Sequence, residues 1–448
     1  MTLLKSIPKI DKFINNKAFD GYSKTLISKI SKEIIENLRK NILENKVTSI
    51  NEQTLVNSVI KQYDNLTSPS LQTVINATGI IVHTNLGRSL INKKSLEKAI
   101  NIATSYNNLE YSLEEGKRGE RYSHIVKTLQ ALTSCEDAIV VNNNASAVFL
   151  ILNTFCKNKE AVVSRGELVE IGGSFRVPEV MTQSGAILKE IGTTNKTHPR
   201  DYENAIGENT SMLMKVHKSN YSIEGFTSEV DFEEIVKIAK ENNVIDYYDM
   251  GSGHMIDLPY NLSNKEPSIL EIMKYNPSLL SFSGDKLLGS VQAGIIIGKK
   301  ELIEKIKKNQ LLRMLRVDKI TLSILEDTLN SYLKNQLDDI PTLKMLHTSL
   351  DILEQRANTL KEKIENICKC EVVKSETLIG GGTTPNRKIP SVALTLEYKN
   401  YKPNKIEKLL RAHNLIVRIE NEKVVLDFRT IQEDEISKIE KIVRKVFN

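Results

Sequence analysis

The chain has 448 residues, of which 40% are hydrophobic and 26% charged, and it carries a formal net charge of +6. This composition is that of a globular protein and excludes a disordered or fibrous one, while the length predicts roughly two or three domains. No run approaches the roughly 20 apolar residues of a membrane helix, and residues 1–20 carry charges where a signal peptide is apolar, so we expect a cytoplasmic protein without a membrane partner. The four cysteines lack zinc-ligand spacing, which predicts free thiols and no metal site.

Two helices are expected near the N-terminus. Apolar side chains recur at helical spacing over 22–43, and a second helix is expected over 51–63, with Asn51 at its start. Residues 1–65 contain eleven Lys or Arg and seven Asp or Glu, so most of the net positive charge lies there. We therefore predict a small helical domain over 1–66. Its basic excess suits a polyanionic partner, although charge alone fits a solvated helical surface equally well.

From Val74 onward, short β-rich runs alternate with helical stretches. Strands are expected at 138–141, 160–164, 187–191, 211–216, 244–249, 279–283 and 293–297. This alternation is typical of an α/β domain with a mainly parallel sheet that binds its ligand at the carboxyl ends of the strands. We assign this large domain to 67–335.

The last part of the chain predicts a small α+β domain over 336–448. After a long helical region through Leu353, we expect a strand at 392–396, a helix at 405–412, strands at 415–420 and 423–428, and a terminal helix from Glu433.

The most specific local signal is the sequence Ser283-Gly284-Asp285-Lys286, which follows an apolar strand. A lysine at a strand end among small residues can approach an aldehyde cofactor, and burial would lower its pKa and make it a nucleophile and proton carrier. The Ser283 hydroxyl could bind a cofactor phosphate. Taken alone, however, an Asp-Lys pair is more often a surface feature.

A second strand end argues against a surface lysine. The strand at 244–249 ends in Asp249, and a carboxylate there could keep the pyridine nitrogen of pyridoxal phosphate (PLP) protonated. An aspartate that only caps a turn is the alternative for this residue.

A third strand end predicts a phosphate cradle. The strand at 138–141 leads through Asn143, Asn144 and Ala145 into a helix, and the backbone N–H groups at a helix start bind phosphate. Cradle, aspartate and lysine follow one another in the order found in fold-type-I PLP enzymes, which the chain resembles from about Val74 to its end.

Longer strings narrow this resemblance to one family. Residues 75–79 (INATG), 83–88 (HTNLGR) and 164–176 (SRGELVEIGGSFR) resemble segments of bacterial selenocysteine synthase, the L-seryl-tRNA(Sec) selenium transferase. Residues 289–294 read GSVQAG, where the family more often has GGPQAG. The resemblance covers essentially the whole chain, including the N-terminal helical domain that binds the tRNA in this family.

The resemblance implies a reaction and its partners. PLP bound to Lys286 would convert L-seryl-tRNA(Sec) to L-selenocysteinyl-tRNA(Sec) for selenoprotein biosynthesis, through an aminoacrylate, with selenophosphate as the selenium donor. The predicted catalytic residues are Lys286, Asp285 and Arg121. The family forms homo-oligomeric rings, typically decamers.

An anionic selenium donor needs a cationic pocket. Arg88, Arg118, Arg313 and Arg316 are therefore predicted to bind substrate. Arg313 and Arg316 are expected at i and i+3 on one helical face, where two guanidinium groups can hold an anion by paired hydrogen bonds. Salt bridges on a solvent-exposed face are the alternative for this pair.

The sequence leaves open the roles of three histidines and two alternative functions. His83, His124 and His217 lie beside the motifs, but a structural histidine is as common as a catalytic one. A PLP lyase or aminotransferase-like enzyme acting on a free amino acid or amino sugar is an alternative function, and the basic N-terminal helices argue against it. A non-catalytic nucleic-acid-binding protein on a degenerate PLP fold would lack Lys286 or Asp249, and both are present.

Overall fold

The computed structural model describes residues 2–168, 170–171, 175–218, 221–262, 267–384 and 387–447. Within the 164–176 segment, residues 169 and 172–174 therefore lie outside the described part of the chain. Contacts divide the chain into two compact units, Met1–Thr73 and Val74–Asn448. In the described ranges, no helix is both long and apolar enough to span a bilayer.

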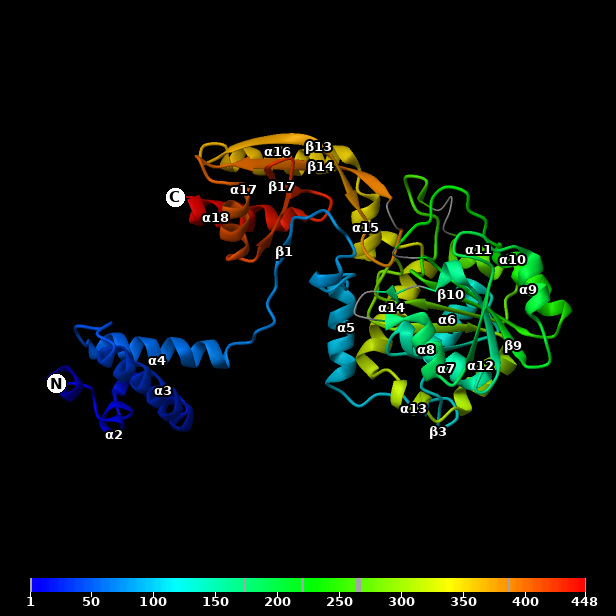
Figure 1. Ribbon diagram of the computed structural model, residues 1–448, viewed down its shortest axis with the longest axis horizontal. Helices are drawn as coiled ribbons and strands as arrows, with labels where there is room; N and C mark the ends of the chain where they lie inside the picture. The colour runs from blue at the N-terminus through cyan, green and yellow to red at the C-terminus, as the bar shows by residue number, and fades with distance from the viewer. Residues whose placement is uncertain are drawn as a thin grey trace. The chain divides into compact units, whose positions relative to one another are not determined.

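The first unit is helical (Figure 1). It contains α1 (Thr2–Lys5), α2 (Ile10–Phe13), the 3-10 turn η1 (Lys17–Phe19), α3 (Lys24–Leu43) and α4 (Glu52–Thr67). Asn51 caps α4, because its side-chain oxygen accepts hydrogen bonds from the N–H groups of Gln53 and Thr54 at 2.9 and 3.2 Å. The apolar faces of α3 and α4 bury Ile30 and Val56 in a core of their own. Both expected helices are present, and α4 continues to Thr67.

The second unit is built on a seven-stranded sheet with the order β4-β12-β11-β10-β9-β5-β8. Its strands are β4 (Asp137–Val141), β5 (Glu160–Ser164), β8 (Ile187–Ile191), β9 (Thr210–Val216), β10 (Ile245–Gly251), β11 (Leu279–Ser283) and β12 (Gly294–Gly298). β12 pairs antiparallel with β4 and β11, and the other pairs are parallel. All seven strands were expected from the sequence, and the mainly parallel α/β fold is confirmed.

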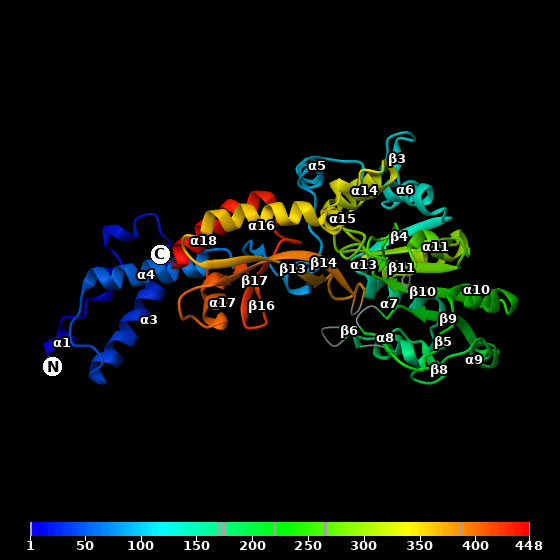
Figure 2. The same cartoon turned by 90° about the horizontal axis from the view of Figure 1, so that it is seen from above.

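Helices cover both faces of this sheet (Figures 1 and 2). The helices of this part of the chain are α5 (Lys93–Ala103), α6 (Ser123–Thr133), α7 (Asn144–Phe155), α8 (Val177–Gln183), α9 (Pro199–Ala205), α10 (Phe232–Glu241), α11 (Ile269–Met273), α12 (Lys300–Lys308), α13 (Leu312–Leu315), α14 (Lys319–Leu333) and α15 (Pro341–His347), with the 3-10 turns η2 (Thr84–Leu86), η3 (Arg165–Glu167) and η5 (Leu337–Asp339). Short two-stranded pairs lie outside the main sheet, namely β2 (Tyr111–Ser112) with β3 (Lys117–Arg118) and β6 (Glu170–Ile171) with β7 (Phe175–Arg176).

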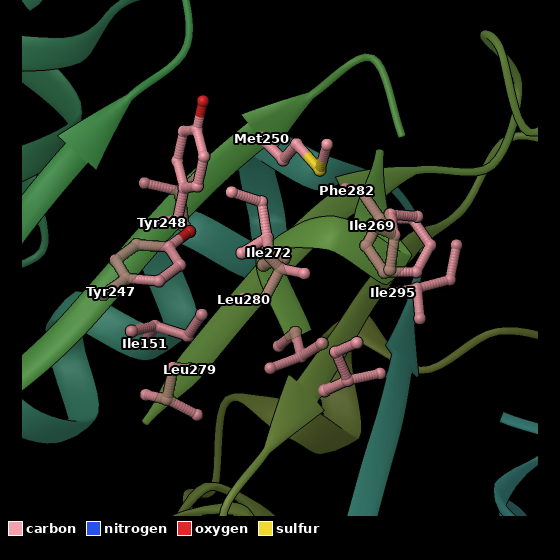
Figure 3. Packing of buried hydrophobic residues seen from close by; sticks show 14 of the residues in the cluster. Ile151, Tyr247, Tyr248, Met250, Ile269, Ile272, Leu279, Leu280, Phe282 and Ile295 are labelled. Atoms are coloured by element: carbon pink, nitrogen blue, oxygen red, sulfur yellow. The ribbon is translucent and has the colours of Figure 1, made fainter. Parts of the chain in front are cut away.

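The core of this sheet explains why the central strands read as continuous apolar runs. Successive residues of β11, such as Leu279 and Leu280, are fully buried, so both faces are covered. Figure 3 shows Ile151 of α7 and Ile272 of α11 among the side chains of β10 and β11. These central strands fix the positions of the loops at their carboxyl ends.

A second sheet of four antiparallel strands lies near the C-terminus, in the order β13-β14-β17-β16. It comprises β13 (Lys369–Leu378), β14 (Lys388–Glu397), β16 (Arg418–Glu420) and β17 (Lys423–Asp427), and it packs with α16 (Leu350–Ile364), α17 (Pro403–Arg411) and α18 (Ile436–Phe447), which follows the 3-10 turn η6 (Glu433–Glu435). β13 was not predicted, because alternating charged residues on this half-exposed strand hide its apolar positions.

The chain enters the second unit through this C-terminal core. β1 (Ile75–Asn76) pairs in parallel with β15 (Leu415–Ile416), and Ile75 and Ala77 pack in the same apolar cluster as β14 and α18. The domain limits expected at 66/67 and 335/336 remain predictions.

Candidate active site

Lys286 lies in the loop after β11 and is only 8% exposed. The segment after η2 holds this loop in place. The Ser89 hydroxyl donates a 2.5 Å hydrogen bond to the Lys286 carbonyl, and the Ser89 N–H donates to the Asp285 carbonyl at 3.3 Å. The segment 83–88, which carries part of the family resemblance, is therefore followed directly by a residue that contacts the lysine loop. Neither the 83–88 motif nor the lysine motif indicates this contact by itself.

Burial lowers the pKa of Lys286, and the positive charge of Arg88 lowers it further, while Asp249 and Asp285 act in the opposite direction. Arg88 forms an ion pair of 2.6 Å with Asp285. This pair brings a predicted catalytic residue and a predicted substrate-binding residue together beside the lysine. A larger fraction of neutral amine makes Lys286 a better nucleophile.

Asp249 is 5% exposed and lies in β10, between Val216 of β9 and Ser281 of β11. Burial raises the pKa of Asp249, and a hydrogen bond of 2.7 Å from the Asn144 side-chain amide lowers it, as does the charge of Lys286. The Asp249 carboxylate therefore accepts a hydrogen bond from the Asn144 side chain and lies near the Lys286 amine, unlike an aspartate that only caps a turn.

The predicted phosphate cradle is the first turn of α7. Asn143 is the N-cap, and its side-chain oxygen accepts a 2.8 Å hydrogen bond from the Ser146 N–H. The N–H groups of Asn144 and Ala145 belong to the first turn, where no intrahelical acceptor exists. Gly294 of β12 packs against this turn so closely that a Cβ atom there would lie 2.2 Å from the Asn143 carbonyl oxygen.

Several buried polar atoms in this region have no hydrogen-bond partner among the described residues. They are the side-chain oxygens of Asn144, Ser252 and Thr384. Ser252 and Thr384 are 1% and 2% exposed. Because buried polar groups are normally paired, such atoms indicate a ligand. With Lys286, Asp249 and the α7 turn, they fit a phosphorylated aldehyde that carries a ring nitrogen. Ser283, also predicted to bind the phosphate, is 5% exposed at the end of β11.

A second group of predicted residues surrounds Glu110. Arg121 donates to this carboxylate at 2.7 Å, Arg118 at 3.0 Å, and Arg316 lies 3.7 Å away. The hydrogen bond from Arg121 is the largest cause of the lowered pKa of Glu110. Arg118 is 81% exposed in its side chain, whereas Arg121 is 15% exposed.

The expected helical pairing of Arg313 with Arg316 is wrong. α13 ends at Leu315, and Arg316 has an extended backbone, with φ −67° and ψ 144°. Both arginines instead line a cavity of about 280 Å³, together with Arg121 and Lys307. Arg316 also forms a β-bridge with Val141, so this cationic cavity adjoins the strand end that leads to the phosphate cradle.

The histidines differ in their surroundings. His124 contacts the carbonyl oxygens of Asn108 and Leu109 at 3.2 and 3.3 Å, which is a structural arrangement. Burial lowers the pKa of His83. Burial, and then the charges of Lys286 and His254, lower the pKa of His217 to about 3, so its imidazole is neutral beside the lysine.

Comparison with known proteins identifies the family of this chain. A family model described as SelA, L-seryl-tRNA selenium transferase, matches residues 74–432. The chain belongs to the L-seryl-tRNA selenium transferase family. Members of this family that resemble it over their whole length include the L-seryl-tRNA(Sec) selenium transferases of Aliarcobacter butzleri (strain RM4018), which is 76% identical over 100% of this chain and 99% of that protein, and of Sulfurimonas denitrificans, which is 63% identical over 100% of both.

A solved structure of low sequence identity shares the fold. It is described as D-glucosaminate-6-phosphate ammonia-lyase, with a TM-score of 0.61 and 18% identity over 86% of this chain and 97% of that chain. The likeness concerns the fold alone at this identity. The family model begins at residue 74, so it does not cover the helical first unit. The full-length relatives match this unit as well.

Proposed function

We propose that the chain converts L-seryl-tRNA(Sec) to L-selenocysteinyl-tRNA(Sec) with selenophosphate as the selenium donor. The observation that carries the proposal is the buried Lys286 beside the buried Asp249, at the carboxyl ends of adjacent strands, in a chain of this family. In the overall reaction the seryl Cβ–O bond breaks, a Cβ–Se bond forms, and the P–Se bond of selenophosphate breaks to give phosphate.

The proposed cofactor is PLP, attached to Lys286. When bound, PLP withdraws electrons from the α-carbon of an attached seryl group, which allows the α-proton and then the β-hydroxyl to leave. Asp249 would hold a proton on the ring nitrogen, and Asn144 would keep that carboxylate charged through its 2.7 Å hydrogen bond. The N–H groups of Asn144 and Ala145 would hold the phosphate at the start of α7.

Lys286 is the proposed proton carrier. Because burial lowers its pKa, its Nζ can take up the seryl α-proton and deliver a proton to the departing β-hydroxyl. Asp285 would act through its 2.6 Å ion pair with Arg88, which fixes the loop that presents Nζ. Arg88 itself is partly exposed, at 38% of its side chain, and can also face substrate.

The cationic cavity beside β4 is the proposed site for the selenium donor. Arg313 and Arg316 line it with Arg121 and Lys307, which suits a phosphate-like anion. Glu110 holds Arg121 and Arg118 in place at 2.7 and 3.0 Å. We propose that Arg121 organises the cavity wall. Arg118, which is mostly exposed, would contact the seryl-tRNA.

The tRNA is the proposed partner of the helical first unit, Met1–Thr73, whose basic excess suits a polyanion. We also propose a homo-oligomer, a decamer as in the family, acting in the cytoplasm. A lyase acting on a free amino acid or amino sugar is not favoured, because the similarity to the ammonia-lyase concerns the fold alone.

The proposal is tested by transfer of labelled selenium. Purified protein with PLP is incubated with labelled selenophosphate and either seryl-tRNA(Sec) or free L-serine, and label is measured on tRNA and on free amino acid. We expect label on tRNA alone. Label on free selenocysteine with none on tRNA would contradict the proposal and favour an enzyme that acts on a free amino acid.

A further inference from the structure

A glycine loop, defined as Gly380–Thr384, lies between β13 and β14 in the chain and reaches Lys286. β13 and β14 pair from Lys369 opposite Glu397 to Leu378 opposite Lys388, and in Figure 2 this hairpin extends from the four-stranded sheet toward β11. Gly382 has φ +76°, and a Cβ atom added there would lie 2.8 Å from Nζ of Lys286 and 3.0 Å from its Cε. The backbone of the loop therefore packs directly on the lysine side chain.

Contacts with segments outside the hairpin hold the glycine loop at both ends. The Val82 N–H donates to the Ile379 carbonyl at 2.7 Å, and Val82 forms a parallel bridge with Gly380. At the other end, Nη1 of Arg387 donates to the carbonyl oxygens of Asn261 and Leu262, each at 3.0 Å. These contacts fix where the loop meets Lys286.

Two threonines of the glycine loop differ in a way that indicates a ligand. The Thr383 hydroxyl donates a 2.6 Å hydrogen bond to the Gly380 carbonyl and so closes the turn. The Thr384 hydroxyl, in a residue that is 2% exposed, has no partner among the described residues. A buried hydroxyl without a partner is costly, which favours a bound group beside it.

We propose that the glycine loop is part of the active site and that Gly382 is the positioning residue for Lys286. This inference rests on the proposed function, since it concerns the lysine that would carry PLP. A nitrogen and a carbon atom normally approach to about 3.5 Å. A side chain at 382 would push Nζ away by a large part of an ångström, and displacements of that size are enough to slow a positioned reaction by one to two orders of magnitude.

The test compares alanine substitutions at two glycines in the full-length protein. Gly382→Ala adds a Cβ against Nζ. Gly116→Ala repeats a left-handed backbone strain, at φ +61°, where the nearest atom is the Tyr111 hydroxyl at 3.9 Å. The readout is the rate of formation of the covalent lysine–PLP adduct, followed by its absorbance after PLP is added to the apoprotein.

We expect Gly382→Ala to form the adduct at least about 10-fold more slowly than wild type, with the Gly116→Ala control within about 2-fold of wild type, the size of effect expected where no close contact is added. A folded Gly382→Ala protein with the wild-type rate overturns the inference. Absence of the adduct in wild type overturns the proposed function instead, and the two failures are thereby distinguished.

Arg387→Ala is the second variant, in case Gly382→Ala does not fold. It removes one anchor of the loop without adding atoms near the lysine, so water gains access to Lys286. Because burial lowers the pKa of this lysine, exposure raises it, and the pH midpoint of adduct formation shifts upward. An unchanged midpoint in Arg387→Ala contradicts a role of the loop in positioning the lysine.

Discussion

The side-chain amide of Asn144 donates a 2.7 Å hydrogen bond to the buried carboxylate of Asp249, 105 positions away in the chain. Asn144 is the first residue of α7, and Asp249 lies in β10. One contact thus joins the predicted phosphate cradle to the predicted partner of the ring nitrogen. It also opposes the effect of burial, which raises the pKa of Asp249.

Replacing Asn144 by alanine should move the acid limb of the pH–rate profile. Without this donor the pKa of Asp249 rises further, so the carboxylate is protonated at a higher pH. We expect the acid limb of kcat/KM to shift upward by about 1–2 pH units, since a hydrogen bond to a charged group contributes about 1.5–3 kcal/mol. Asn142→Ala, at an exposed neighbour, is the control. An acid limb that stays in place in Asn144→Ala would show that Asp249 does not govern it.

Asp249→Asn should retain PLP but slow turnover by about 10²–10³-fold, because an amide cannot hold the proton on the ring nitrogen. Absorbance of the bound cofactor and single-turnover rates measure the two effects separately. If most of the activity remained, Asp249 would have only a structural role in β10.

Arg313→Ala and Arg316→Ala should impair selenium transfer more than loss of the seryl hydroxyl, because both arginines line the cationic cavity proposed to bind the selenium donor. We expect the KM for selenophosphate to rise about 10-fold or more for each variant, the loss of about 1.4 kcal/mol of binding or more. Lys308→Ala, at another residue of the cavity wall, is a control for charge alone. Equal damage to both steps would point to a packing role.

Removal of Met1–Thr73 should abolish binding of seryl-tRNA and leave the lysine–PLP adduct intact. The cut after Thr73 follows the limit between the two units, so it removes α4, which continues to Thr67, as a whole. Binding by the full-length chain should weaken as salt rises, because contacts with phosphates release counterions. Titration of tRNA at two salt concentrations measures both effects. Unchanged affinity in a folded truncation would refute the role of the first unit.

Local sequence patterns predicted the central sheet well, because buried strands such as β11 are short apolar runs bounded by small residues. The same patterns missed β13, whose polar face is half exposed. They also placed Arg316 on a helix, although the helical turn of α13 ends one residue earlier. Periodicity describes a residue's neighbours in the chain and not where a short helix stops.

Lys286 and Asp249 could be found from the sequence because each follows or ends an apolar strand, and adjacent strand ends meet at one edge of the sheet. The contacts of Gly382 with Lys286 and of Ser89 with the lysine loop could not be found in this way. They join segments far apart in the chain, and no spacing rule relates them. A run of glycines indicates a tight approach, but not the residue that is approached.

The attachment of PLP to one lysine is the most direct test. The full-length protein with PLP is reduced with borohydride and digested, and the modified peptide is identified by mass spectrometry, alongside Lys286→Ala and a control, Lys274→Ala, at an exposed lysine. We expect the phosphopyridoxyl group on Lys286 in wild type and Lys274→Ala. Lys286→Ala should keep its fold by circular dichroism, lose the label and lose turnover by about 10³-fold or more. A label on another lysine of the wild-type chain, or one that persists at full yield in Lys286→Ala, would contradict the assignment of Lys286.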